Sequence, residues 1–281
     1  MSVLWFSLMG LFAAGVVWGV LFESSDRRRI AERRRASGAE IETLRRRKES
    51  MTESALRLVA TNAPVFSKIG GLPETPPGLI WPVGPAGPLD FLLQVDLAAA
   101  RAAGGPAWLP PAGSLYLFGD EQAGFAENAW GIFEPPGPRA SLSPPPGVDP
   151  YAERRVAFEQ RTVQPDFYWL GEDFRRWPRE FWAPGPPRDP ASHQIGGYPD
   201  QIQTANIPLI CEQAARNFAG VQRASVKQAE PSQSWRLLAQ IDSDDDLGMN
   251  WGDTGTVYVM VRTAQALAGD FSEVVVITQT Y

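Results

Sequence analysis

The 281-residue chain carries 26 Lys and Arg residues against 32 Asp and Glu residues, and the two signs are unevenly distributed. Residues 26–48 hold nine Arg and one Lys against four acidic residues, whereas residues 49–281 hold 16 basic and 27 acidic residues, which argues against nucleic acid as a partner of this acidic body. The single cysteine excludes an internal disulfide, and the single histidine excludes any site that needs two histidines of one chain.

Residues 3–22 (VLWFSLMGLFAAGVVWGVLF) form an apolar run without a charge. As a helix, this run matches the roughly 30 Å hydrocarbon core of a bilayer. Six arginines follow it within residues 27–35, so we expect a retained anchor in the cell membrane with the N-terminus outside and the remainder in the cytoplasm. Gly15 and Gly19 form a GxxxG step that favours a homodimer, although glycine is also common in membrane helices generally.

Residues 23–50 are rich in helix formers but have few apolar positions. They predict a solvated, Arg-rich helical stalk that is interrupted near Ser37 and Gly38. Residues 51–281 are expected to form the globular domain. Its first element is predicted to be a short amphipathic helix over residues 53–60 (ESALRLVA).

Beyond residue 60, short apolar runs alternate with Pro and Gly, which predicts an α+β fold of mainly antiparallel sheet behind the transmembrane helix. Strands are expected at residues 66–69, 89–97, 113–119, 155–163, 235–242, 256–262 and 274–280. Helices are expected at residues 173–182 and 207–218, with a helical turn at 264–268. Seven prolines within residues 135–150 predict an extended connection.

Three short motifs occur twice in the same order, which predicts an internal duplication of two β-rich halves, roughly residues 62–134 and 190–281. The IGG run at residues 69–71 recurs at 195–197, and the GSLY run at 113–116 recurs as GTVY at 255–258. Between these motifs, Gln94 and Asp96 recur as Gln240 and Asp242.

The same residues resemble the bacterial YwqG-like family, a domain of unknown function. The matching pieces are SKIGGLPETPPGLIWP (67–82), FLLQVDL (91–97), GSLYLF (113–118), HQIGGYPDQIQ (193–203) and QIDSDDDLGMNWGDTGTVYVMVR (240–262). The resemblance covers roughly residues 62–281 and implies an α+β fold dominated by antiparallel sheet. It brings no established activity and no catalytic residues, and it suggests an immunity-type role in a toxin system as one further alternative.

The most distinctive chemistry is the acidic loop that follows residue 241. Its oxygen-bearing side chains fall at relative positions 1, 3, 5, 9 and 12 of a calcium-loop spacing: Asp242, Asp244, Asp246, Asn250 and Asp253. The match is defective, because position 6 is Leu247 instead of glycine and the flanking segments predict strands instead of helices. Ca²⁺ or Mg²⁺ would suit these ligands, and no other cofactor is expected. The alternative is that Asp and Gly form the turns of a hairpin.

Asp245 and Trp251 complete the candidate binding loop, as a further carboxylate and an aromatic anchor for a protein partner. Core packing would explain the tryptophan equally well. Asp96 and Asp242 would serve an enzyme if they converged in a cleft, or would each cap a loop in its own half. His193 and Cys211 favour structural roles, since Cys211 is flanked by apolar residues. The leading interpretation is a membrane-anchored, non-enzymatic module that binds an unidentified protein partner. A calcium- or magnesium-dependent module or enzyme centred on residues 242–253 is the alternative.

Overall fold

The computed structural model describes residues 37–84, 86–119, 129–166, 169–170, 176–178, 191–203, 205–218 and 234–281. The predicted membrane span at 3–22, with Gly15 and Gly19, lies outside the described residues, as do the arginines of 27–35 and most of the predicted helix at 173–182. Among the described helices, none combines the length and the apolar character needed to span a membrane.

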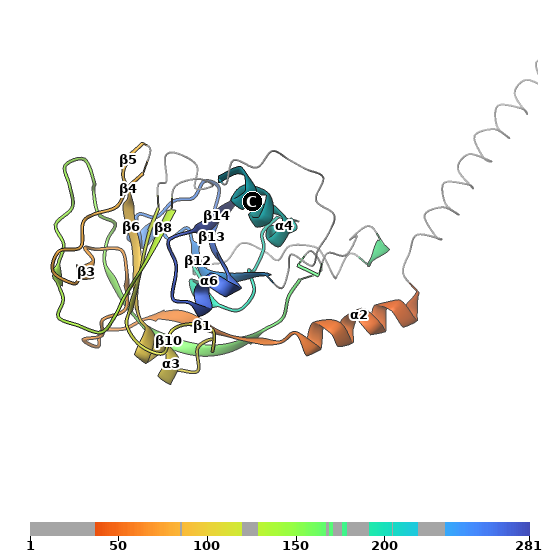
Figure 1. The fold of residues 1–281 in the computed structure, drawn as a ribbon. Helices are drawn as coiled ribbons and strands as arrows, with labels where there is room; N and C mark the ends of the chain where they lie inside the picture. Colours follow the sequence, from red (N-terminus) through yellow and green to blue (C-terminus); the bar gives the residue numbers. More distant parts are fainter. Residues whose placement is uncertain are drawn as a thin grey trace, which may run out of the picture.

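Ten described strands form one antiparallel sheet in the order β14-β13-β12-β11-β1-β10-β2-β6-β7-β8. The edge strands β14 and β8 contact each other, so the sheet curls into a nearly closed barrel (Figure 1). The strands are β1 (Glu53–Ala60), β2 (Lys68–Ile69), β6 (Asp90–Asp96), β7 (Ser114–Gly119), β8 (Ala129–Glu134), β10 (Arg154–Val163), β11 (Gln194–Gly196), β12 (Trp235–Asp242), β13 (Thr256–Arg262) and β14 (Val274–Gln279).

Short elements complete the described fold. The strand pair β3 (Glu74–Thr75) and β9 (Ala140–Ser141) and the strand pair β4 (Val83–Gly84) and β5 (Gly87–Pro88) lie outside the large sheet. The described helices are α2 (Gly38–Ser50), α3 (Leu97–Ala102), α4 (Ile207–Phe218), α6 (Thr263–Leu267) and the 3₁₀ turn η4 (Asp245–Leu247). The mainly antiparallel fold predicted from the sequence is thus confirmed.

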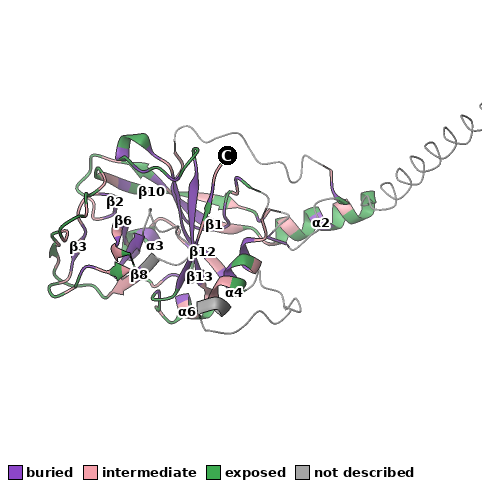
Figure 2. Cartoon of the chain, turned by 90° about the horizontal axis from the view of Figure 1, so that it is seen from above, coloured by how far each residue is buried: buried purple, intermediate pink, exposed green. Residues whose placement is uncertain are grey.

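The hydrophobic core explains why the predictions for β12 and β13 are correct to the residue. Both strands are buried along nearly their whole length (Figure 2). Some of their side chains, including Ile241 and Val259, pack in the main core. Others, including Leu237 and Met260, pack against Ile207 at the start of α4. Strands covered on both faces read as continuous apolar runs, which are easy to recognise.

The predicted helix at residues 53–60 is wrong, because this segment forms β1. β1 pairs with β10 along its whole length, from Glu53 opposite Val163 to Ala60 opposite Val156, and its other edge pairs with β11. The backbone hydrogen bonds gained on both edges outweigh the helix propensity of ESALRLVA. No strand was expected at β8 or β11.

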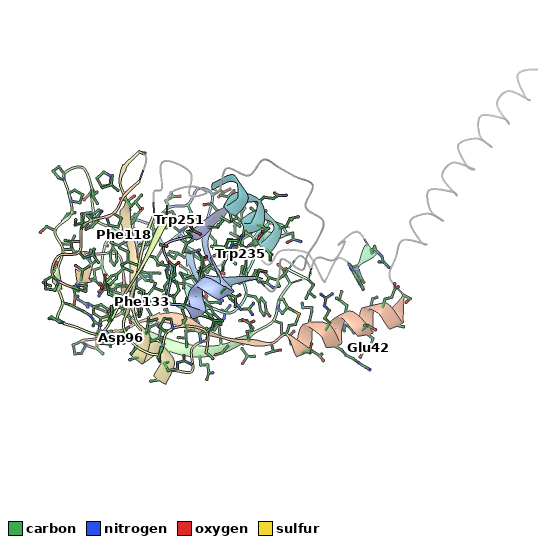
Figure 3. The ribbon with its side chains drawn as sticks, viewed as in Figure 1. Glu42, Asp96, Phe118, Phe133, Trp235 and Trp251 are labelled. Carbon is green, nitrogen blue, oxygen red and sulfur yellow. The ribbon has the colours of Figure 1, made fainter. Side chains whose placement is uncertain are left out.

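The stalk prediction is only partly correct. Helix α2 begins where the interruption was expected, and Ser37 and Glu40 form a capping box at its N-terminus. The helix extends away from the barrel (Figure 1), and Glu42 on it is exposed (Figure 3). Leu44, however, is buried and packs against Leu170 and Trp177. Ile41 of the same helix also packs against this cluster, so the helix is docked through its apolar side chains and is not solvated on all sides.

The strand register repeats between the two parts of the sheet. Lys68 lies opposite Gln94 where β2 meets β6, and Gln194 lies opposite Gln240 where β11 meets β12. The strands β6 and β12 each carry a bulge at the same place. The pairing crosses over at β1 and β10. β1 pairs with β11, which is the strand after β10 in the chain, and β10 pairs with β2, which is the strand after β1. The two parts are therefore interlocked through the centre of the sheet.

Candidate functional site: an ionic pocket beside the acidic loop

The acidic loop is folded into hydrogen bonds at its first two carboxylates. Asp242 is buried and accepts from the Thr256 hydroxyl at 2.7 Å and from the Ser192 backbone N–H at 2.8 Å. Asp244 is also buried and accepts from the Arg154 guanidinium and from His193 Nε2, the latter at 3.1 Å. Both carboxylates thus have protein donors as partners.

The tautomer of His193 follows from this geometry. The backbone N–H of Asp242 donates to His193 Nδ1 at 3.2 Å, so the proton of the neutral ring sits on Nε2 and is donated to Asp244. The pKa of Asp244 is lowered well below its usual value, first by the hydrogen bond from His193 and then by Arg154, which together outweigh the effect of burial. Asp244 therefore stays ionised in the folded protein.

The other three members of the predicted metal set, Asp246, Asn250 and Asp253, are exposed, as is Asp245 of the candidate binding loop. Asp246 contacts Arg154 at 3.3 Å. Within the described part of the chain, no three His, Cys, Asp or Glu side chains are grouped so that they could hold a metal ion. Leu247, at the position where a calcium loop needs glycine, is buried in the core. The structure does not bring the five predicted ligands together.

Trp251, for which the sequence suggested either an anchor for a partner or core packing, is buried and contacts Tyr151 edge-on at 6.0 Å. Its ring stabilises the loop against the segment before β10.

The repeat-equivalent residues have matched structural roles. Gln94 Oε1 accepts from the Glu74 backbone N–H at 2.8 Å, and Gln240 Oε1 accepts from the Asp200 backbone N–H at 2.9 Å. Asp96 caps α3 by accepting from the backbone N–H groups of Ala98 and Ala99 (Figure 3). Asp96 and Asp242 are thus each engaged within their own half, as the capping alternative predicted.

Cys211 and His193 do not form a catalytic pair. Cys211 lies on the buried side of α4, where burial raises the pKa of its thiol. His193 is hydrogen-bonded to the Asp242 backbone and to the Asp244 side chain. Both residues have structural roles.

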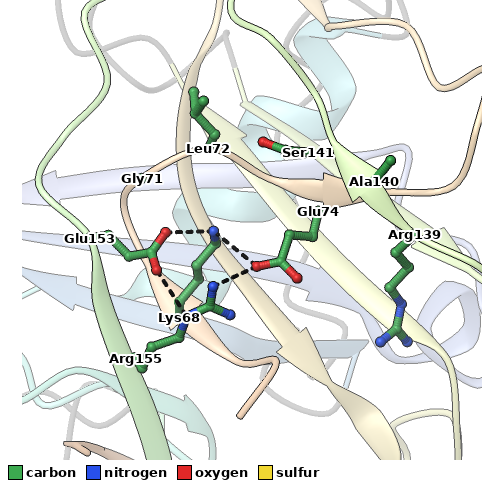
Figure 4. Close-up of a pocket in the computed structure, with 9 residues that line it drawn as sticks. All are labelled: Lys68, Gly71, Leu72, Glu74, Arg139, Ala140, Ser141, Glu153 and Arg155. Carbon is green, nitrogen blue, oxygen red and sulfur yellow. Dashed lines mark hydrogen bonds and ion pairs between the residues drawn. The ribbon is translucent and has the colours of Figure 1, made fainter. Parts of the chain in front are cut away.

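A pocket of about 550 Å³ lies beside β2 and β10, and sequence reasoning did not find it (Figure 4). Lys68 is at its floor and is nearly fully buried. Lys68 Nζ contacts Glu153 at 2.7 Å and Glu74 at 3.4 Å. Arg155 closes the cluster, contacting Glu74 at 2.6 Å and Glu153 at 2.9 Å. Two cations and two carboxylates therefore alternate in a closed ring.

Glu153 and Arg155 keep their charges in the folded protein. Burial would raise the pKa of Glu153, but the hydrogen bond and charge of Lys68, followed by Arg155, lower it below its usual value. The pKa of Arg155 is raised, because Glu74 and Glu153 outweigh the opposing effect of burial. A lysine this buried requires such partners, since an unpaired charge in the interior is very costly.

Backbone geometry at two glycines makes room for the cluster. Gly70 and Gly71 have φ values of +66° and +71°, a region that favours glycine. A Cβ atom on Gly71 would lie 2.5 Å from the Glu153 carboxylate, and one on Gly70 would lie 2.2 Å from the Ala152 carbonyl oxygen. The first IGG motif thus lets β2 turn tightly past the residues that precede β10.

The sequence contains one signal that points toward this site. The residue before the first IGG motif is Lys68, whereas the residue before the second is Gln194, and both lie opposite a glutamine of the neighbouring strand. Gln194 donates to the carbonyl oxygens of Gly196 and Tyr198 instead of to carboxylates. Of these two equivalent positions, only the first carries a charge.

The model of one protein family, described as a domain of unknown function (DUF1963), matches residues 67–280. The match includes β2 to β14 and omits α2 and β1, although β1 lies in the centre of the sheet. No curated protein matches the chain.

Proposed function

The chain belongs to the DUF1963 family of domains of unknown function, and we propose that it is a membrane-anchored, non-enzymatic binding module whose ligand site is the pocket above Lys68. The observation that carries this proposal is the ionic ring at the floor of a hollow of about 550 Å³. A hollow of this size suits a small molecule or a short segment of a partner.

The chemistry of the ring favours binding over catalysis. Each of its charged groups neutralises another, and the lowered pKa of Glu153 makes this carboxylate a poor proton donor near neutral pH. The buried Cys211 thiol is an equally poor nucleophile, because its pKa is raised. A rigid, paired cluster instead holds its donors and acceptors ready for a ligand, which reduces the entropy lost on binding.

The anchor and the orientation are part of the proposal. The apolar run at residues 3–22 and the six arginines of 27–35 support a single span with the domain in the cytoplasm. Docking of α2 through Leu44 would then fix the barrel close to the membrane surface. We also propose that the duplicated motifs and the repeated strand register reflect an ancestral duplication, and that the chain falls within the YwqG-like group.

A small-molecule screen on the full chain in detergent tests the ligand site. Ala140 is exposed and lines the pocket, so Ala140→Trp should fill the hollow without disturbing the core. Ala264 is exposed on α6, away from the pocket lining, and Ala264→Trp is the matched control. Compounds that raise the melting temperature of wild type and Ala264→Trp should fail to do so with Ala140→Trp. Equal responses of all three proteins would refute the pocket as the ligand site.

Fractionation tests the anchor. The full chain should remain in the membrane pellet in high salt and enter the soluble phase only with detergent. Release by high salt alone would contradict a spanning helix.

A further inference from the structure

One cation of the pocket stands apart from the ionic ring. The guanidinium carbon of Arg139 lies 3.7 Å from the centre of the Phe66 ring, over its face. Phe66 is itself held edge-on against Tyr116, in the aromatic cluster of Trp81, Leu89, Phe91 and Phe118. Arg139 is therefore fixed against a rigid platform at the wall of the pocket.

Arg139 differs from the other two cations of the pocket in its partners. Lys68 and Arg155 each contact both carboxylates of the ring, whereas among the described residues no carboxylate lies within ion-pair distance of Arg139. Figure 4 shows it opposite the ring, on the far side of Glu74, with no interaction drawn to it. Three cations against two carboxylates leave the pocket lining with one positive charge in excess.

An excess positive charge in a hollow stands out on this molecule, because residues 49–281 carry 16 basic and 27 acidic residues. Low-dielectric walls focus the field of such a charge into the hollow and attract an ion of opposite sign. A guanidinium whose face is covered by an aromatic ring still presents its N–H edge, which matches the two oxygens of a carboxylate or phosphate. Ser141 lines the same pocket, and a serine hydroxyl is a hydrogen-bond donor.

We propose that the pocket holds an oxyanion subsite at Arg139, which takes the carboxylate or phosphate group of a small ligand. This inference rests on the proposed ligand site and names the chemistry that the site recognises. The paired ring of Lys68, Glu74, Glu153 and Arg155 supports the floor, and Arg139 supplies the unneutralised charge.

An NMR titration of the full chain in detergent tests the subsite, with inorganic phosphate and acetate as separate probes at constant ionic strength. The Arg139 side-chain N–H signal of wild type should shift in a saturable manner with at least one probe. Arg139→Gln should weaken binding, read from neighbouring backbone signals, by about tenfold or more, since a charge-assisted hydrogen bond is lost. Arg139→Lys, which keeps the charge but not the planar fork, should lie between the two.

Arg262 offers a matched control. It lies over the Trp235 ring at 4.6 Å, as Arg139 lies over Phe66, but its guanidinium is paired with Glu212 at 3.0 Å. Arg262→Gln removes the same charge and a similar ring contact and should leave probe affinity unchanged. Equal weakening of probe binding by Arg139→Gln and Arg262→Gln would show that only the net charge of the protein matters, and would overturn the subsite. The absence of a saturable shift with both probes would also overturn it.

Failure of the subsite and failure of the ligand site give different results. A compound from the screen that binds wild type and Arg139→Gln equally, but not Ala140→Trp, would refute the oxyanion subsite and retain the pocket. A compound that binds all three equally would refute both.

Discussion

Asp244 is the residue at which the hydrogen-bonded interpretation of the acidic loop differs most sharply from a metal-binding interpretation. Its carboxylate accepts from Arg154 and from His193 Nε2, and its side chain is 6% exposed. Asp244→Asn keeps the shape but replaces one acceptor oxygen with an N–H₂ donor. His193 Nε2 and Arg154 Nη1 both face Oδ2, and Arg154 Nη2 faces Oδ1. An amide oxygen at the Oδ2 position keeps the first two bonds, and Arg154 Nη2 then faces an N–H₂ group and loses that acceptor.

The expected cost follows from these contacts. Leaving one buried donor without a partner costs about 1–3 kcal/mol, and breaking a fully buried ion pair costs about 3–5 kcal/mol. The Arg154 side chain is 25% exposed, so water compensates part of the second cost. We expect Asp244→Asn to destabilise the domain by about 2–3 kcal/mol at pH 7. Asp246→Asn, which alters the same arginine's other partner, should cost less than about 0.5 kcal/mol, because the Asp246 side chain is 90% exposed.

Thermal unfolding of the full chain in detergent, followed by tryptophan fluorescence between pH 7 and pH 3, measures both the size of the destabilisation and its pH dependence. The pKa of Asp244 is lowered in the folded state, so its contribution is fully present above the unfolded Asp pKa of about 3.9. The contribution is lost as the pH falls from there toward the folded pKa. The gap between wild type and Asp244→Asn should therefore be constant near neutrality and narrow below about pH 4.

Two results would contradict this structural role of Asp244. Equal melting temperatures for Asp244→Asn and Asp246→Asn would show that the buried network contributes nothing. A wild-type melting temperature that rises with millimolar Ca²⁺ or Mg²⁺, with the rise abolished in Asp244→Asn, would show that Asp244 serves as a metal ligand.

Three further predictions follow from the fold. Cys211 should resist a thiol reagent at pH 8 in the folded protein and react on unfolding, because burial raises its pKa; rapid labelling of the native chain would contradict this. Gly71→Ala should destabilise by about 1 kcal/mol more than Gly78→Ala in thermal unfolding, because an overpacked site costs about this much or more. Both glycines have positive φ, but only the first would clash, with Glu153; equal losses would show that the clash relaxes without cost. A chain cut after residue 137 should be folded by circular dichroism only when both pieces are present, because β1 pairs with β10 and β11; a piece that folds alone would refute the interlocked sheet.

The sequence predicted those elements whose local pattern and tertiary environment agree. The strands β12 and β13 are buried on both faces and read as apolar runs. Asn206 accepts from the Leu209 backbone N–H at the start of α4, as a helix-capping residue should. Each of these features depends only on residues that are close together in sequence.

The sequence failed where distant segments decide the outcome. ESALRLVA became a central strand only because β10 and β11 supply partners for both of its edges. The sequence failed to predict the candidate site for the same reason. Lys68 and Glu153 lie 85 positions apart, so no local motif joins them, whereas the neighbouring aspartates of the acidic loop suggested a single site and then separated into buried and exposed sets.

The most direct test of the account is a map of amide chemical-shift changes on the full chain in detergent, recorded with a compound that raises the melting temperature of wild type. The largest changes should surround Lys68, Arg139 and Arg155. Changes centred on Asp245, Asp246 and Asp253, with the pocket unaffected, would contradict the proposed ligand site and show that the acidic loop binds the compound.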